Sequence, residues 1–543
     1  MTNMQEPQAK PVDDSALLAS LGYKQELKRE FTAIELFGFG FSVSAIVPSV
    51  ASVLAFSLPN GGPSAMIWGV RMDCYHLHPF AYLVISGLQW ATASVFLMFI
   101  AMAMAELASS APTSGGLYYW TYKFSSPRTR NLLCWIVGYT NTISYITGLA
   151  GSDWSCAVLI MAGATIGSNG AFVPTLHQTF GVFCAVVISH AIVASCATKF
   201  IARIQYLFIA INLALVLVMI IGLPSATPAE FKNSAKYAFG NFVNLTPWPN
   251  GYAFVLSFLS PLWSIGGFDL GVHISEEARN ASVTVPWAIL SVTAISCILG
   301  FAIQISVAFC MGTDTLGILS SPIQQPMATI LLNSFGRRGM LAVWSLMFIA
   351  LYMAGVSLLT SGSRQVFAFS RDGALPLSSF LYKINSVMGT PVRCVWLSAI
   401  SALLLGCITF AGSTATGALF TLGVVGQYMA NSIPVAARYF GGQPFKKGPF
   451  HLGIFSMPVA TIAVLWMWFM TIVLLFLTAP NPSASTMNYT VVVAFGVWFL
   501  AIGYYYFPRY GGRYWFEGPV ANVETESSEV QSPADEKMYP LAE

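Results

Sequence analysis

Apolar residues recur along this chain in twelve segments of about membrane-crossing length, and short polar stretches separate them. A membrane helix needs about 20 mainly apolar residues. The segments that meet this length lie at about 32–57, 88–110, 131–158, 179–198, 201–223, 251–275, 285–311, 339–368, 394–411, 415–437, 455–478 and 488–507. We therefore predict an all-α integral membrane protein with twelve transmembrane helices. Its membrane domain covers 31–507, between an N-terminal tail at 1–30 and a C-terminal tail at 508–543.

Two of the apolar segments contain residues that interrupt a helix. In the first span, Gly38, Gly40 and Pro48 divide the apolar run, and in the sixth span Pro261 precedes the sequence SIGGFD at 264–269. Free backbone groups are tolerated at membrane depth only where they line a cavity or are buried in protein. A pair of interrupted helices at corresponding places in the chain indicates the substrate site of a transporter.

Composition and charge place the chain in a bilayer and orient it there. Of the 543 residues, 56% are hydrophobic and 9% are charged, whereas soluble domains carry about 25% charged residues. If both ends are cytoplasmic, 20 of the 25 Lys and Arg residues fall in cytoplasmic segments. This bias follows the positive-inside rule and favours an even number of spans.

Ionisable residues inside membrane segments are costly, and they are therefore candidates for function. Asp269 follows the glycine pair of the sixth span, and it is either a polar gate or proton-linked site, or an acid that caps freed amides. Glu276 lies near the cytoplasmic end of that span beside Arg279, where a charged interfacial cluster is favoured over a substrate ligand. Glu106 ends the second span, where a structural or gating role is favoured over direct coupling.

The first break is uncharged, with Ser42, Ser44, Ala45 and Ile46 before Pro48. Helix N-termini present amide donors to an anion, and free carbonyls at the other half can hold an ammonium group. The two breaks together therefore suit a zwitterion. A quaternary ammonium would instead need aromatic faces, and nearby aromatic residues keep that alternative open: Phe39, Phe41, Trp263 and Phe268.

Several function classes lack their motifs in this chain. There is no GxxxxGK[ST] phosphate loop for ATP-driven pumping, and no HExxH or GxSxG motif for a membrane hydrolase. The nine cysteines are scattered without CxxC spacing, which favours small buried hydrophobes over metal ligands. We expect no enzymatic activity, no cofactor, no metal and no nucleic-acid or ATP partner.

Five stretches resemble a known family. They are LGYKQELKREF (21–31), PNGGP (59–63), AELASSAPTSGGLY (105–118), IGGFD (265–269) with the two glutamates at 276–277, and SRDGALP (370–376). The chain resembles fungal members of the amino acid–polyamine–organocation superfamily, in the amino acid/choline branch that includes GABA permeases. The resemblance covers about 17–518. It implies two inverted five-helix repeats (LeuT-like, with helices 1 and 6 broken), two extra helices, a substrate between the broken spans and proton-coupled uptake at the plasma membrane.

The resemblance also assigns roles to positions. Ser44, Ala45 and Ile46 match the family's loop in the first span, where many relatives have glycines. The sixth-span loop of the family is matched at 266–269, with Phe268 as the gate aromatic. The predicted substrate-binding residues are Ser42, Ser44, Ala45, Ile46, Trp263, Gly266, Gly267 and Phe268. The predicted gating or coupling residues are Asp269, Glu106 and Glu276.

One departure from the family concerns 70–89. Relatives run from Gly-Gly-Pro through Trp-Gly-Trp into the second helix, whereas here twenty residues separate Trp68-Gly69 from Trp90. Removing 70–89 restores Trp-Gly-Trp, and Val-Arg at 70–71 and Gln89 can be encoded by GTA-AGN and CAG, which would fit the borders of a short in-frame intron. We interpret the segment as a retained intron, and the alternative is a true extracellular loop insertion.

These observations predict a secondary active permease for a small amino acid or amine, with GABA the favoured substrate. Its partners would be that small molecule, protons and the lipid bilayer. The expected location is the plasma membrane, with the vacuolar membrane as the alternative, and both termini are expected to be cytoplasmic. A choline or quaternary amine transporter is the alternative within transport, and a transporter-like nutrient receptor is the alternative outside it.

Overall fold

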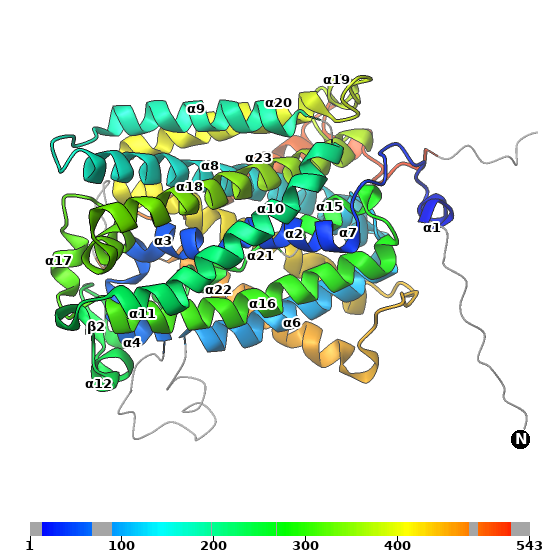
Figure 1. Ribbon diagram of the computed structural model, residues 1–543. Helices are drawn as coiled ribbons and strands as arrows, with labels where there is room; N and C mark the ends of the chain where they lie inside the picture. The colour runs from blue at the N-terminus through cyan, green and yellow to red at the C-terminus, as the bar shows by residue number, and fades with distance from the viewer. Residues whose placement is uncertain are drawn as a thin grey trace, which may run out of the picture.

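The computed structural model describes residues 14–67, 89–196, 198–267, 269–476, 480 and 487–522. Its long helices run side by side as one bundle (Figure 1). They are α6 (Gln89–Ser110), α8 (Arg130–Gly167), α9 (Leu176–Ala194), α10 (Thr198–Leu217), α16 (Ala281–Cys310), α18 (Pro326–Arg371), α20 (Val392–Gly406), α21 (Ser413–Phe440), α22 (Ser456–Leu475) and α23 (Tyr489–Tyr506).

Shorter elements cover the two ends of the bundle. The helices are α1 (Asp14–Ser20), α4 (Gly62–Ile67), α7 (Gly116–Phe124), α11 (Leu223–Ala226), α12 (Ala235–Gly240), α17 (Thr315–Leu319) and α19 (Ser378–Leu381). The strands β1 (Asn60–Gly61) and β2 (Val243–Asn244) pair antiparallel. In Figure 1, α12, α17 and β2 lie at one end, and α1 and α19 lie at the opposite end. The helical class predicted from the sequence is confirmed.

Ten helical segments in the described part of the chain are long and apolar enough to cross a membrane. They match ten of the twelve spans predicted from the hydropathy pattern. The predicted sixth span instead forms three short helices, α13 (Asn250–Ser257), α14 (Leu259–Ser264) and α15 (Leu270–His273). The predicted tenth span forms α21, whose Gln427 and Asn431 make it less apolar than its neighbours.

The first predicted break is present in the structure. The helix stops after α2 (Ala33–Ser44) and restarts as α3 (Ile46–Ser57). Ala45 lies between them in the left-handed region, with φ 32°, a conformation that is unfavourable for a residue with a Cβ. Pro48 in the first turn of α3 has no amide hydrogen, which suits a helix start. The hydroxyl of Ser49 donates to the carbonyl of Ser44 at 2.7 Å, which satisfies one freed acceptor.

The second break lies between α14 and α15. Gly267 has φ +86° there, which glycine adopts without steric cost. The broken helices are enclosed by long ones, because α3 packs on α14 and α18, and α14 also packs on α6 and α21. The fold therefore buries both breaks next to each other in the middle of the bundle.

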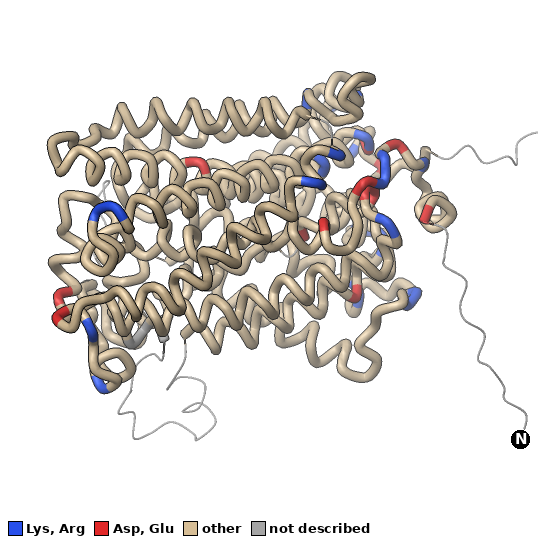
Figure 2. Tube along the Cα trace, in the orientation of Figure 1, with Lys and Arg blue, Asp and Glu red and all other residues tan. Residues whose placement is uncertain are grey.

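Charged residues gather at one end of the bundle. Figure 2 shows most Lys and Arg residues at the end that carries α1 and α19, with few at the opposite end or along the helices. The described part of the N-terminal segment packs onto this end, where Leu18, Tyr23 and Leu27 are buried. Residues 14–30 are therefore part of the folded structure.

Two sequence predictions fall on residues outside the described part of the chain. The segment 70–89 is described only at Gln89, the first residue of α6. Helices α4 and α6, which flank this segment in the chain, contact each other. The second prediction concerns Phe268 as the gate aromatic, and Phe268 also lies outside the described residues.

Candidate substrate site

A small cavity of about 70 Å³ lies between the two breaks. Its lining comes from α2, α3, α8, α14, α15, α18, α21 and the loop between α14 and α15. The lining residues are Val43, Ser49, Asn141, Ser144, Tyr145, Gly148, Ser152, Leu262, Trp263, Gly266, Gly267, Leu270, Leu351, Ala354, Leu358, Gly423, Val424 and Gln427. None of these described side chains carries a formal charge, so a bound molecule would meet backbone, hydroxyl and amide groups.

The predicted residues of the first break lie around this cavity rather than on it. Ser42 is buried, and its hydroxyl donates to Gln205 on α10 at 2.9 Å. Ser44 faces a second, smaller cavity of about 20 Å³ between α2, α16 and the second break. Ala45 and Ile46 are buried in packing. The side chains that face the main cavity from this break are instead Val43 and Ser49.

Residues of the second break line the cavity as their predicted role requires. Trp263, Gly266 and Gly267 all contribute to its wall. Gln427 of α21 holds this loop in place, because its carbonyl accepts from the Gly267 amide at 3.3 Å. The amide group of Gln427 donates to Asp269 Oδ1 at 2.8 Å. One side chain therefore connects the cavity wall to the buried carboxylate.

Asp269 is fully buried beside His273, one turn further along. Its Oδ2 lies 3.3 Å from His273 Nε2. Asp269 stands at the N-cap position of α15, but its side chain makes no capping hydrogen bond. The contacts therefore belong to a side-chain network with His273 and Gln427, and the alternative in which the acid caps freed amides has no hydrogen bond to support it.

Beyond the cavity, away from the end of the bundle that carries α1, lies a larger pocket that we call the funnel. This funnel measures about 830 Å³ and is lined by residues of α3, α8, α21 and the segments around β2 and α17, among them Phe56, Trp154 and Phe420. Trp263 of the inner cavity packs edge-on against Phe420 of the funnel, with ring centroids 4.9 Å apart. These two rings lie between the small cavity and the funnel.

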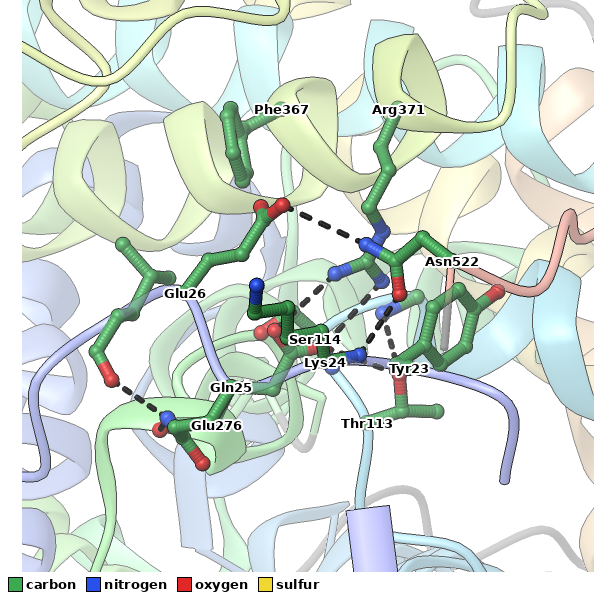
Figure 3. A network of polar contacts seen from close by, with 12 residues as sticks. Tyr23, Lys24, Gln25, Glu26, Thr113, Ser114, Glu276, Phe367, Arg371 and Asn522 are labelled. Carbon is green, nitrogen blue, oxygen red and sulfur yellow. Dashed lines mark hydrogen bonds and ion pairs between the residues drawn. The ribbon is translucent and has the colours of Figure 1, made fainter. Parts of the chain in front are cut away.

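A buried ion pair lies toward the end of the bundle that carries α1. Both side chains of the pair are nearly inaccessible, and Arg371 Nη1 lies 3.2 Å from Glu276 Oε2. Glu276 Oε1 also accepts from the hydroxyl of Thr113 at 3.1 Å and from the amide of Ser114 at 3.0 Å. Figure 3 shows these groups together with residues of the N-terminal segment. We call Glu276, Arg371, Thr113 and Ser114 the inner gate, after the end of the bundle at which they lie and the role proposed for them below.

Both chain ends cover the inner gate. The Arg371 guanidinium lies over the ring of Tyr23 at 3.9 Å, and the amide of Gln25 donates to the carbonyl of Glu276 at 2.8 Å. In Figure 3, Asn522 of the C-terminal segment reaches toward Lys24 and Glu26. The N-terminal segment therefore packs on the inner gate, and the C-terminal segment packs on the N-terminal one.

Asp372 adjoins this layer at the end of α18. The hydroxyls of Tyr23 and Tyr118 donate to its Oδ2 at 3.2 and 2.7 Å, and the Val520 amide donates to its Oδ1 at 3.1 Å. Burial raises the pKa of Asp372 to about 6, although Arg371 and these hydrogen bonds oppose the shift. The carboxylate is therefore mostly ionised at neutral pH, where it accepts from both chain ends.

Glu106 lies away from the cavity, in a network of its own. Its carboxylate pairs with Arg438 of α21 at 2.6 Å and accepts from the Ser456 hydroxyl of α22 at 2.6 Å. It thus joins α6 to α21 and α22 at the end of α6. These contacts agree with the structural role favoured from the sequence, and they give Glu106 no contact with the cavity.

Sequence reasoning missed several polar residues in or next to the site, including the following four. Asn141, Ser144 and Gln427 line the cavity, and His273 contacts Asp269. The first three lie inside the uninterrupted helices α8 and α21, where no local break marks them. The available signal was polarity alone, because an amide or imidazole group within a predicted span faces the interior of a bundle.

Two broken helices around a small closed cavity, in a bundle of apolar helices, define a membrane transport protein. The chain belongs to the amino acid permease family, whose model matches residues 76–498. It is 36% identical to the GABA-specific permease of Saccharomyces cerevisiae, over 95% of this chain and 87% of that protein. It is 35% identical to an uncharacterized amino-acid permease of Schizosaccharomyces pombe, over 96% and 93%. Amino-acid permease 2 of Neurospora crassa is 30% identical, over 93% and 89%.

Proposed function

We propose that this chain is a secondary active permease that takes up a small amino acid, with GABA the favoured substrate. The observation that carries the proposal is the cavity between the two breaks, which offers backbone and neutral polar groups to a ligand. A zwitterion has one end for amide donors and one for carbonyl acceptors. The name of the Saccharomyces cerevisiae relative supports GABA among such substrates.

The lining of the cavity favours a short amino acid over a quaternary amine. Trp263 and Tyr145 are the aromatic residues in its described wall. A quaternary ammonium site needs several aromatic faces, so choline remains the alternative that the uptake assay must test.

Alternating access through the two sides completes the proposal. Twelve helices, with spans 1–5 and 6–10 as inverted repeats, would rock around the cavity. The structure then represents a state with the inner gate closed and a funnel on the outer side. The Lys and Arg side chains near α1 support a cytoplasmic location for that end (Figure 2). The plasma membrane is the proposed location, and protons are the proposed driving ion.

Uptake of radiolabelled GABA, proline and choline in permease-deficient yeast tests the proposal. Accumulation of GABA that a proton uncoupler abolishes is the expected result. Accumulation of choline alone would move the assignment to a quaternary amine transporter. Surface expression without accumulation of any of the three would favour a nutrient receptor. A vector control measures background uptake.

Replacing Asp269 with asparagine is expected to lower uptake and to flatten its dependence on external pH, without loss of surface expression. The change keeps the size of the side chain but removes the charge that His273 and Gln427 contact. Asp153→Asn is the matched control, because Asp153 is equally buried and lies on α8 outside the cavity wall. Unchanged kinetics across pH in the Asp269 variant would remove this residue from the mechanism.

We also propose that 70–89 is a retained intron. The contact between α4 and α6 supports this, because a chain that lacks the segment could pass directly from one helix to the other. Sequencing of the cDNA tests the proposal. Transcripts that keep these codons as the dominant species would establish a true loop. The uptake assay should include both forms of the chain.

A further inference from the structure

We propose that His273 is the carrier of the coupling proton, together with Asp269, and that its ring transmits the presence of that proton from the substrate cavity to the inner gate. This inference rests on the proposed proton-coupled uptake. It assigns a role to a residue that lies behind the cavity wall, where it contacts Asn141 and Tyr145, and that does not contact the inner ion pair directly. The argument depends on the groups that surround the two ring nitrogens.

His273 is completely buried on α15, and both of its ring nitrogens face hydrogen-bond acceptors. Nδ1 lies 2.7 Å from the carbonyl oxygen of Ser114, which can only accept. Nε2 lies 3.3 Å from Asp269 Oδ2 and 3.0 Å from the side-chain amide of Asn141. The other amide atom of Asn141, its Oδ1, is buried without a partner. A 180° turn of this amide would direct its oxygen at Nε2.

With the Asn141 nitrogen toward Nε2, the ring can be neutral and accept from this amide. With the oxygen toward Nε2, as its lack of a partner in the other orientation favours, the contacts set the number of protons on the pair. The Ser114 carbonyl requires a hydrogen on Nδ1. If Nε2 also carries a hydrogen, the ring is an imidazolium that donates to an Asp269 carboxylate. If Nε2 is bare, its lone pair faces Asp269 Oδ2, and the contact is favourable only when Asp269 is protonated. In both arrangements the pair holds one proton more than a neutral histidine and an ionised aspartate.

The pair is connected to the substrate cavity on one side. Gln427 lines the cavity and donates to Asp269 Oδ1 at 2.8 Å, and it also accepts from Gly267. Movement of the Gly267 backbone around a bound substrate would therefore change the contacts of Asp269. A proton from the outer solution can reach the carboxylate from this side while the inner gate is closed.

The pair is connected to the inner gate on the other side. The carbonyl of Ser114 accepts from His273 Nδ1, and the backbone amide of Ser114 donates to Glu276 Oε1 at 3.0 Å. Glu276 in turn pairs with Arg371. Gly116, two residues after Ser114, leaves room for the imidazole ring, because a Cβ added to Gly116 would lie 3.2 Å from His273 Cε1. One imidazole thus bridges the carboxylate near the cavity and the loop that closes the inner side.

Other ionisable groups near α15 have partners of their own or are neutral. On α8, the Tyr145 ring meets the imidazole edge-on, with centroids 5.4 Å apart. Beside α15, Glu276 and Glu277 pair with Arg371 and Arg364 of α18, and Glu35 of α2 pairs with Arg203. Helix α16 contains no Asp, Glu, Lys, Arg or His. Asp269 is therefore the charged group that His273 contacts directly.

The coupling then follows from the cost of burying charge. With its proton, the pair is neutral overall and tolerates burial. Without it, a lone carboxylate would remain in a dry site, which is strongly unfavourable. Once the outer side has closed over the substrate, the proton can leave only when the inner gate opens and water reaches the pair. Each cycle takes one proton from the outer solution and releases it to the cytoplasm with the substrate.

The test uses the full-length protein in liposomes with the membrane voltage clamped and an inward gradient of one pH unit. If one proton moves with each zwitterion, the wild type should accumulate labelled GABA roughly tenfold, because one unit corresponds to a tenfold ratio. In the His273→Gln variant, the accumulation ratio of labelled GABA should fall to about one, whereas exchange of substrate without a gradient should remain. Failure of the wild type to accumulate would count against the proposed function, before any variant is compared.

His190→Gln is the matched control. His190 is also fully buried, and its Nδ1 lies 2.8 Å from Asp153 Oδ1. This pair lies away from the cavity. The His190→Gln variant should keep the tenfold accumulation. Accumulation of labelled GABA by His273→Gln at the level of the wild type would overturn the inference. If this variant loses exchange as well, His273→Asn is measured, and loss of exchange in both variants would show a structural role and overturn the inference too.

Discussion

Gly267→Ala is expected to reduce uptake by about tenfold or more while the protein still reaches the membrane. Gly267 has φ +86°, where a residue with a Cβ is strained by about 1–2 kcal/mol. An alanine Cβ would also lie 2.2 Å from Leu270 Cδ1, so that Leu270 would have to move within the cavity wall. A change of 1.4 kcal/mol corresponds to a factor of ten. Initial uptake rates, normalised to surface expression, measure this effect.

Gly271→Ala is the control for this prediction. Gly271 lies in α15 near the break, and an added Cβ would come no closer than 3.8 Å to any neighbour. Its uptake should stay within about twofold of the wild type, because helical glycines tolerate alanine. Equal uptake by both variants would show that the conformation at Gly267 is not required for transport.

Arg371→Gln is expected to weaken apparent affinity for external substrate by about a hundredfold or more. Arg371 and Glu276 are both buried in the closed inner gate. Removing one partner of a buried pair costs about 3–5 kcal/mol, and here that cost falls on the closed-gate state. If only the state that faces outward binds external substrate, the apparent affinity falls with its population. Competition by unlabelled substrate at the cell surface measures the change.

Arg438→Gln separates gating from general destabilisation. Arg438 also forms an ion pair with a nearly buried carboxylate, Glu106, but this pair joins α6 to α21 away from the inner gate. The variant should lower the amount of protein in the membrane and leave the affinity of the remaining protein unchanged. A similar loss of affinity in both variants would contradict a specific role for Arg371 in closure.

The local chemistry of the sequence predicted the breaks well. Glycine and proline interrupt a helix through backbone sterics and a missing amide hydrogen, and these effects do not depend on distant residues. The second break lies at the predicted glycine pair, whereas the first lies at Ala45, three residues before Pro48, and Gly38 and Gly40 remain inside α2. The ten matching spans follow from hydropathy in the same way.

Which side chains face the cavity could not be predicted, because this depends on how each helix is rotated in the bundle. In the first break, the cavity receives Val43 and Ser49, whereas Ser42 turns toward Gln205 of α10. The partner of Asp269 on α21, Gln427, is 158 residues away in the chain. Contacts of this kind arise from packing, and a single sequence contains no local pattern that specifies them.

The central claim is that substrate binds in the cavity between the breaks, and the accessibility of one introduced thiol tests it. Ser152 lines this cavity, and its buried hydroxyl has no partner. Ser155 lies three residues further along α8 and lines the outer funnel. Ser152→Cys and Ser155→Cys should both react with a small charged thiol reagent added outside, and the unmodified chain gives the background.

Saturating GABA should slow labelling of Ser152→Cys by about tenfold or more and leave Ser155→Cys nearly unchanged, because bound substrate would occupy the inner cavity but not the funnel. Labelling of Ser152→Cys at the same rate with and without saturating substrate, in a variant that still transports it, would contradict the account.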